Sequence, residues 1–343
     1  MREVDNRSYA VIQLTDRSLQ QYLTNSGNFL ATPINFFAFY LILFESKREQ
    51  KLYKYVLLAS HVFLYIANLF YGTLANLVLL FPFPAICCIG LMKNSLGGFW
   101  ASLVWMLLFA LFIFFTFAIL MVRLRIVARK GGVFDFSDTS YLVFSVCVFV
   151  YIYVPLSVLW INAYHPKAVQ VDFVKKYFPS NVNAFDNPSI HVDIGEDNQK
   201  ALVALLFVLI FSGVPVYSSL YLAVIFEIKK QTFFRSEKIR RQQRKVVNSA
   251  VFQIAILGNM VFVSLFVLVK NVFAAPEKDT RIPSALANAC LVVASVPCQL
   301  FMVFNNTSYR RAVFRIVGVD SESTTGQKPS AVVSARRSNI STF

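Results

Sequence analysis

Among the neutral polar side chains in the long apolar stretches of this sequence, seven are its candidates for binding chemistry. An amide or imidazole in hydrocarbon is costly unless it is hydrogen-bonded. We therefore expect these groups to face the interior of a helix bundle and to bond to one another or to water. Alternatively, each of them only forms a structural hydrogen bond between helices, worth about 0.6 kcal/mol. The seven are His61, Asn68, Asn76, Gln253, Asn259, Asn288 and Gln299.

Together these groups outline a weakly polar cavity with aromatic walls. Trp105, Tyr217 and Asn259 are expected to line it. Such a cavity suits a small uncharged ligand, because a charged one would lack a buried counter-charge. The predicted ligand-binding residues are His61, Asn68, Trp105, Tyr217, Asn259 and Asn288.

The sequence predicts neither an enzyme nor a metal or cofactor site. Its three histidines, His61, His165 and His191, lack the spacing of metal ligands, and no glycine-rich phosphate loop is present. The apolar stretches contain no Asp or Glu. Transporters coupled to protons or sodium usually hold carboxylates at membrane depth, so this absence disfavours transport.

Seven windows of 21–27 residues without a formal charge must position the polar groups. A helix needs about 20 apolar residues to cross roughly 30 Å of hydrocarbon. The sequence therefore predicts an all-α membrane protein, a bundle of seven transmembrane helices. The windows are Tyr22–Phe44, Tyr55–Phe81, Phe99–Val122, Tyr141–Ala163, Ala201–Phe226, Val246–Val269 and Ser284–Phe304.

The basic residues predict the orientation of this bundle. With the N-terminus outside, 22 of the 33 Lys and Arg residues fall on the inner side, which agrees with the positive-inside rule. The net charge of +15 is then a result of topology, and no nucleic-acid partner is expected. The expected regions are an outer tail over 1–21, a membrane domain over 22–317 and a disordered inner tail over 318–343. Asn6, in Asn6-Arg7-Ser8, is a glycosylation acceptor in the outer tail.

Two basic segments are expected at the inner surface. Residues 229–245 indicate extensions of the fifth and sixth helices beyond the membrane. Their charge fits either contact with anionic lipid or docking of a cytosolic partner. Residues 309–317 place apolar groups on one face and arginines elsewhere, which predicts a short amphipathic helix along the membrane.

The five cysteines do not form a recognisable disulfide framework. Cys147, Cys290 and Cys298 lie in apolar windows, where small buried thiols are expected, and Cys87-Cys88 is expected on the outer side. The long outer loop, 164–200, contains no cysteine, so the disulfide that rhodopsin-like receptors form between this loop and the third helix is impossible.

Several motifs resemble nematode serpentine chemoreceptors, most closely class H of the Str superfamily. The likeness begins with the run from Pro33 to Phe44, followed by Tyr53-Lys54 and His61, and it extends over about 25–317. Further matching motifs are Leu80-Phe81-Pro82, Phe178-Pro179, Asn187-Pro188, Ser236-x-Lys238 with Arg241-Gln242, and Tyr309-Arg310. Met121-Val122 departs from the family, which often has an acid just ahead of the arginine that stands here as Arg123.

The resemblance implies a G-protein-coupled chemoreceptor in the ciliary plasma membrane of sensory neurons. Its partners would be an odorant or pheromone-like small molecule, a heterotrimeric G protein and membrane lipids. By position, the residues expected to couple to the G protein are Arg123, Arg125, Arg235, Lys238, Arg240, Arg241, Tyr309 and Arg310.

Two other classes of membrane protein remain as alternatives. An odorant-gated cation channel of seven helices usually has its N-terminus inside, and it would carry current without a G protein. A transporter would accumulate substrate in vesicles, and it is the least favoured class because the buried carboxylates are missing.

Overall fold

The computed structural model describes residues 18–45, 51–80, 85–177, 179, 182–194, 196–230, 237–272 and 281–316. Within these residues, seven helical segments are long and apolar enough to cross a membrane, which confirms the predicted all-α seven-helix fold. The long elements are α2 (Ser18–Tyr40) with the π-helical turn η1 (Leu41–Glu45), α3 (Lys51–Leu69) with the π-helical turn η2 (Phe70–Leu74), α4 (Lys93–Val127), α5 (Asp138–Asn162), α8 (Glu196–Lys230), α9 (Glu237–Val272), and α10 (Arg281–Val293) with α11 (Ser295–Asn305).

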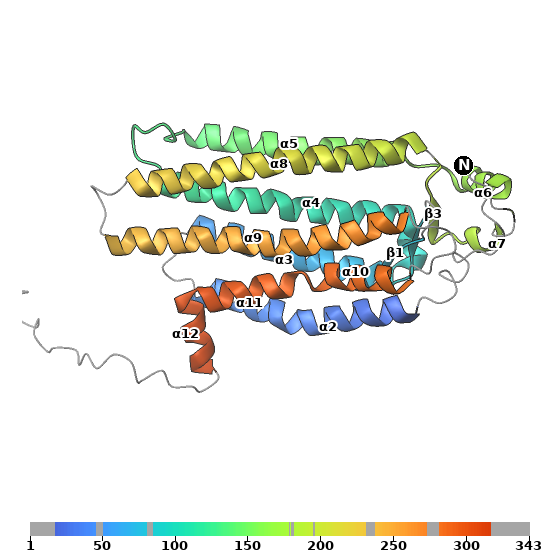
Figure 1. Cartoon of the computed structure of the whole chain (residues 1–343), viewed down its shortest axis with the longest axis horizontal. Coiled ribbons are helices and arrows are strands. Elements are labelled where there is room, and N and C mark those ends of the chain that lie inside the picture. Colours follow the sequence, from blue (N-terminus) through green and yellow to red (C-terminus); the bar gives the residue numbers. More distant parts are fainter. Residues whose placement is uncertain are drawn as a thin grey trace, which may run out of the picture.

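The bundle has two different ends (Figure 1). One, here called the sheet end, holds the short helices α6 and α7 and a small β-sheet. The other, the α12 end, holds the helix that follows α11. The long helix α4 packs against α3, α5, α8 and α9, and its first turns also touch the sheet. The shorter elements are α6 (Lys167–Tyr177), α7 (Val182–Phe185), α12 (Thr307–Ile316), β1 (Leu77–Leu79), β2 (Ala85–Cys88) and β3 (Ile190–Val192).

The small sheet joins two loops that are distant in sequence. Its strands are antiparallel in the order β1-β2-β3, with Val78 opposite Cys87 and Ile86 opposite His191. The predicted continuation of the second helix to Phe81 is therefore wrong, because the helical segment stops at Leu74. Asn76 then takes a positive φ of 44°, which turns the chain into β1.

Helix α2 presents polar groups to the bundle and large apolar groups outward. Gln20, Thr24, Asn28 and Asn35 are all buried, and the first three are spaced by four residues, which places them on one face of a helix. The exposed large residues of α2 include Phe29, Leu30 and Phe36. This pattern is the reverse of a helix in a soluble protein, and it is expected where the surrounding solvent is lipid.

The seventh span is broken at Ala294, between α10 and α11. Pro297 has no backbone N–H, so the carbonyl of Val293 loses its usual helical donor there. The break is held against α2, where the amide of Asn35 donates to Ser295 Oγ over 3.2 Å. Gln299 donates to Asn35 Oδ1 beside this bond.

The predicted amphipathic helix is α12, which turns sharply from the end of α11 and points away from the bundle (Figure 1). Tyr309 and Ala312 are buried and pack in the core cluster that includes Leu41 and Met302. Arg315 lies 3.7 Å from Glu45 at the end of η1. Tyr309 thus fixes α12 to the bundle, and its role in G-protein coupling stays a prediction.

The cysteines do not follow the expected burial throughout. All five are free thiols, and Cys87, Cys88 and Cys298 are buried as small apolar groups. Cys147 and Cys290 are exposed on the outside of the bundle, so the expectation of burial is wrong for them. A thiol is small and weakly polar, and it is tolerated on a face that meets lipid tails as well as in a core.

The basic segment 229–245 follows the expected helical extensions where it is described. Helix α8 continues to Lys230 and α9 begins at Glu237. Both predicted tails, with Asn6, lie outside the described residues apart from 18–21, and Arg235 also lies outside them.

We expect Gly98→Ala to destabilise the sheet end, because the first turns of α4 pass directly under the loops. A Cβ at position 98 would lie 2.9 Å from the carbonyl oxygen of Ser189 and 3.1 Å from the backbone nitrogen of His191. Overpacking of this kind costs about 1–3 kcal/mol. The melting temperature of the purified protein measures it. Gly258→Ala is the control, since its Cβ would meet nothing within 4 Å and alanine favours a helix. Equal melting temperatures for the two variants would contradict this account.

Candidate functional site

The predicted ligand-binding residues do not form one cluster, but three of them gather around Tyr71. The hydroxyl of Tyr71 donates to Asn288 Oδ1 over 2.5 Å, which joins η2 to α10. The ring of Trp105, on α4, lies 4.8 Å from that of Tyr71, centroid to centroid. Asn68 is buried one turn before Tyr71 on the same side of the helical segment. Asn68, Trp105 and Asn288 therefore surround one position in the half of the bundle near the sheet end.

The other three predicted ligand residues lie apart. His61 is buried on α3, nearly three turns before Tyr71. Tyr217, on α8, packs edge-on against Phe117 and lies within electrostatic reach of Tyr53, about 27 Å along α3 from Tyr71. Asn259 is exposed on α9, and its amide donates to the carbonyl of Ala255 in its own helix over 2.8 Å. The prediction that Asn259 faces the interior is wrong, because a bond one turn back satisfies this amide locally.

The sequence analysis missed Tyr71, which is the centre of this cluster. Tyr71 is 4 % exposed. Its apolar window contains several other aromatic residues, so its residue type alone does not single it out. The available signal was its position one turn after Asn68, which places a phenol and an amide on one face. The same reasoning would have found the polar face of α2, where Asn28 donates to Thr73 Oγ1 over 2.8 Å.

His191 fastens the loop that carries β3 onto the bundle. Its Nδ1 lies 3.0 Å from Gln170 Nε2 on α6, and its ring lies 4.8 Å from that of Phe99 on α4. Gln170 Oε1 also accepts from the backbone N–H of Val192 over 2.9 Å. We call His191, Gln170 and Phe99 the loop clasp. Burial lowers the pKa of His191 to about 4, with a further lowering from the neighbouring His165 and Lys167, so the ring is neutral near pH 7.

Lys167 also binds the loop that carries β3. Its Nζ donates to the carbonyl oxygens of Asn187 and Ile190, each over 2.9 Å. Burial lowers the pKa of this ammonium group, and the nearby carboxylate of Asp186 partly offsets that effect. The loop clasp and these bonds together hold the loop that carries β3 against the sheet end of α4 without a covalent link.

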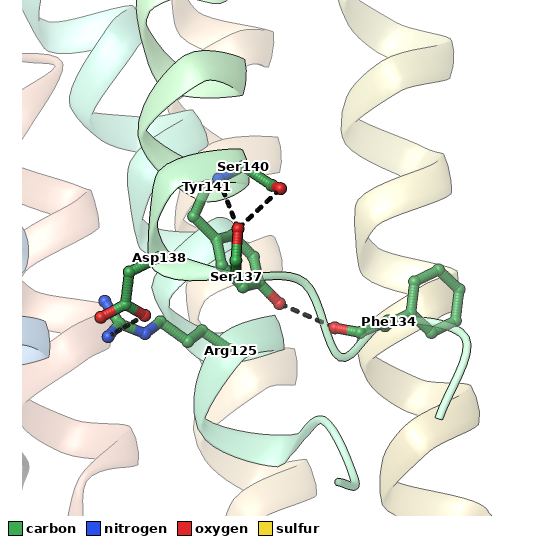
Figure 2. Close-up of polar contacts among 6 residues, drawn as sticks. All are labelled: Arg125, Phe134, Ser137, Asp138, Ser140 and Tyr141. Atoms are coloured by element: carbon green, nitrogen blue, oxygen red, sulfur yellow. Dashed lines mark hydrogen bonds and ion pairs between the residues drawn. The ribbon is translucent and has the colours of Figure 1, made fainter. Parts of the chain in front are cut away.

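At the α12 end, an exposed ion pair links α4 to α5 (Figure 2). Arg125 Nη2 lies 2.5 Å from Asp138 Oδ1, and the two side chains are 42 % and 80 % exposed. The helix α5 starts at a cap, where Ser137 Oγ accepts from the backbone N–H of Ser140 over 3.1 Å. Tyr141 donates to the carbonyl of Phe134 over 3.0 Å, which folds the connecting loop back on the helix.

A second ion pair at this end is buried, and the sequence analysis did not anticipate it. Arg129 Nε donates to Glu227 Oε2 over 3.1 Å, which connects the end of α4 to the end of α8. The Glu227 side chain is 1 % exposed, whereas that of Arg129 is 34 % exposed. The fifth charge-free window, Ala201–Phe226, ends one residue before this carboxylate. The signal in the sequence was an acidic residue, Glu227, at the end of an apolar window, where basic loop residues such as Arg129 are also expected.

The predicted coupling residues occupy different environments. Arg123 lies over the ring of Tyr53 on α3, 3.3 Å from the centroid, so its charge is held within the bundle. Arg241 on α9 and Arg310 on α12 are exposed. Lys238 and Arg240 belong to α9, but their side chains are outside the described set. Exposed cations thus surround the α12 end: Lys51, Lys130, Lys229, Lys230, Arg241, Arg244, Lys245, Arg310, Arg311 and Arg315.

Comparison with protein families decides the class. The model described as the serpentine type seven-transmembrane GPCR chemoreceptor Srh matches residues 17–319. This chain belongs to the Srh chemoreceptor family. A comparison with curated proteins finds none that matches.

Membership in the Srh family agrees with the seven spans and makes the chain a multi-pass membrane protein of a receptor family. Within the described residues of this Srh chain, no group of three or more His, Cys, Asp or Glu side chains could hold a metal ion. The geometry instead supplies a buried amide and phenol cluster near one end and a basic surface at the other.

We expect acid to loosen the loop clasp of the Srh chain. His191 has a pKa of about 4 when clasped and about 6.5 when free, so the open loop binds the proton more tightly. The clasp is therefore fully stable above pH 6.5 and loses about 2 kcal/mol by pH 5, or roughly 30-fold in opening. Hydrogen exchange of the Cys88 and Val192 amides at several pH values, corrected for intrinsic rates, measures this.

Two variants control for that experiment. His191→Gln should remove the extra opening in acid, because no proton is taken up at this position. His165→Gln keeps the clasped ring and should keep the acid response. Unchanged exchange between pH 7 and pH 5 in the wild-type chain would refute the account.

We expect the two ion pairs at the α12 end to respond differently to mutation. Arg129→Met strands the buried Glu227 carboxylate, and the loss of one partner of a buried pair costs about 3–5 kcal/mol. Glu227→Gln should cost less, because the partly exposed Arg129 can reach water. Asp138→Asn, at the exposed pair, should change stability by about 1 kcal/mol at most. Thermal unfolding measures all three, and equal losses would show that burial of Glu227 has no energetic weight.

Proposed function

We propose that this chain is a G-protein-coupled chemosensory receptor that binds a small uncharged ligand within its helix bundle. In this proposal the sheet end faces outside and the α12 end faces the cytosol. A heterotrimeric G protein and anionic lipid meet the α12 end, and the receptor resides in the plasma membrane of the cilia of chemosensory neurons. Membership in the Srh family supports the receptor class.

The observation that carries this proposal is the concentration of exposed cations at the α12 end. Arg241, Arg244 and Lys245 on α9 lie at the same end as Lys229 and Lys230 on α8. This surface is suited to acidic groups on a cytosolic protein and to anionic headgroups. An outer surface with such a charge would oppose the positive-inside rule.

The ligand would act by differential affinity for two arrangements of the bundle. The residues around Tyr71 would bind it. Helix α4 contacts that cluster through Trp105 and the α12 end through Arg125, and Arg129 follows just after its last residue. We accordingly propose Arg123, Arg125 and Arg129 as residues that respond to the change. The direct contacts are assigned to Arg235, Lys238, Arg240, Arg241 and Arg310.

We expect the fourfold variant Arg235→Gln, Lys238→Gln, Arg240→Gln and Arg241→Gln to abolish ligand-evoked signalling while surface expression persists. Calcium imaging of cells that carry the chain and a G protein, screened with volatile and water-soluble odorants, measures the response. Neutralising Lys175 and Lys176 on α6 is the control, since it removes exposed charge at the sheet end. Full signalling by the fourfold variant would contradict the coupling assignment, and an evoked current in membranes without G protein would favour a channel.

The orientation has its own test. We expect a glycan at Asn6 and none at Asn339 of Asn339-Ile340-Ser341, because only the first acceptor would reach the outside. Glycosidase shifts of single-site variants measure this. A glycan at Asn339 alone would invert the proposed topology.

A further inference from the structure

The hydrogen bond between Tyr71 and Asn288 fixes which half of this amide is used. The phenol donates to Asn288 Oδ1, and both residues are buried, at 4 % and 1 % exposure. With its oxygen engaged by Tyr71, the amide directs Nδ2 and its two N–H donors elsewhere. Within the described parts of the chain, this Nδ2 has no hydrogen-bond partner.

A second amide nitrogen in the same region is in the same state. Asn68 is 6 % exposed, and its Nδ2 also lacks a partner among the described residues. Its backbone carbonyl already accepts from Asn28 Nδ2 over 3.3 Å. Asn68 Nδ2 and Asn288 Nδ2 are therefore both unsatisfied donors, whereas Asn28 Oδ1, on the α2 side of Asn68, is an unsatisfied acceptor among the described residues. Buried polar groups of native proteins are normally paired.

The surroundings of these donors are apolar and uncharged. The core cluster around Tyr71 contains Leu291 and Val292 from α10, with Trp105 packed against it from α4. The windows 55–81, 99–122 and 284–304, which supply this region, contain no Asp, Glu, Lys or Arg. A charged ligand would therefore find no opposite charge here.

From these observations we infer that the ligand of this chain presents an uncharged oxygen acceptor to Asn288 Nδ2, with Asn68 Nδ2 as a second donor. Ketones, aldehydes, esters and lactones have this chemistry. Their carbon skeletons would pack on Trp105 and Leu291. The inference rests on the proposed function for placing the ligand inside the bundle, and it adds the class of ligand.

The hydrogen-bond donors and acceptors of each ligand head group predict its relative affinity for this region. An alkane leaves both amide nitrogens unsatisfied. An alcohol offers an acceptor to Asn288 Nδ2 but brings an O–H donor of its own, and the acceptor on the same amide, Asn288 Oδ1, is already engaged by Tyr71. The open acceptor Asn28 Oδ1 lies on the α2 side of Asn68, away from Asn288 in sequence and on another helix. An ammonium group brings only donors together with a charge. The expected order of affinity is therefore carbonyl compound, alcohol, alkane, with amines and carboxylates excluded.

The test is direct binding to the full chain in lipid nanodiscs without any G protein. The probes are straight chains of four to ten carbons in matched series that differ only in head group: alkane, methyl ketone, methyl ester, primary alcohol, amine and carboxylate. Quenching of tryptophan fluorescence and ligand-dependent thermal shifts report binding. We expect ketones and esters to bind more tightly than the alcohol and alkane of equal length.

Matched variants isolate the amide nitrogen. Tyr71→Phe is the reference for the next variant, because it frees Asn288 Oδ1 but keeps Nδ2. In this reference the alcohol should gain affinity relative to the matching carbonyl probe. Tyr71→Phe combined with Asn288→Leu removes the nitrogen without stranding a phenol. We expect a loss of about tenfold or more for the carbonyl probe, equivalent to about 1.4 kcal/mol, which brings it near the alkane.

Three results would overturn the inference: an amine, carboxylate or alkane that binds as tightly as the carbonyl probe, equal affinity in the single and double variants, or no binding by any carbonyl probe of the series. These results are separate from the coupling test. A chain that binds carbonyl probes through Asn288 yet never activates a G protein would overturn the proposed function alone. A signalling amine that ignores Asn288 would overturn only this inference.

Discussion

The hydrocarbon surroundings decide how this chain folds, because polar groups there have no water to bond. Amides and hydroxyls must therefore bond within their own helix or toward another helix. Helix α2 buries Asn28 and Asn35 against its neighbours while Phe29 and Phe36 face outward. Single bonds of this kind contribute only about 0.6 kcal/mol. Their main effect is therefore to specify which faces meet, and close packing of the apolar groups then stabilises the arrangement.

Helix α4 contacts elements at both ends of the molecule. From Gly97 to Val127 it runs about 45 Å, as one continuous helix beyond the non-helical Gly97. Trp105 lies beside the buried amides, and Arg125 lies at the opposite end in an exposed pair. A tilt or shift of this helix at Trp105 must also move Arg125, unless the helix bends between them.

Local pattern was sufficient to predict the seven spans and α12, because the lack of charge over about 20 residues and the spacing of apolar side chains are properties of one segment. The positions that could not be predicted depend on partners distant in sequence. The second helix ends early because β2 offers its backbone to residues 77–79, and β3 joins from about 100 residues further on. Glu227 is paired within the bundle because Arg129 reaches it from the connection that follows α4.

The same limit applies to the candidate site. Asn68 and Asn288 were identifiable as amides within apolar windows, whereas the bond that orients Asn288 needed the position of Tyr71 on another span. Asn259 looked equivalent in the sequence, yet it bonds within its own helix. An amide in an apolar window thus has two solutions, one local and one between helices, and only the packing of neighbours decides between them.

The absence of any disulfide among the five thiols has a practical consequence for the loop that carries β3. In a receptor whose loop is tethered by sulfur, loosening that loop requires a reductant. Here the attachment consists of an imidazole, an amide, a lysine and a short strand, all of which separate and rejoin by thermal motion. The loop of this receptor is therefore indifferent to the redox state of its surroundings, and its correct attachment does not depend on oxidative folding enzymes.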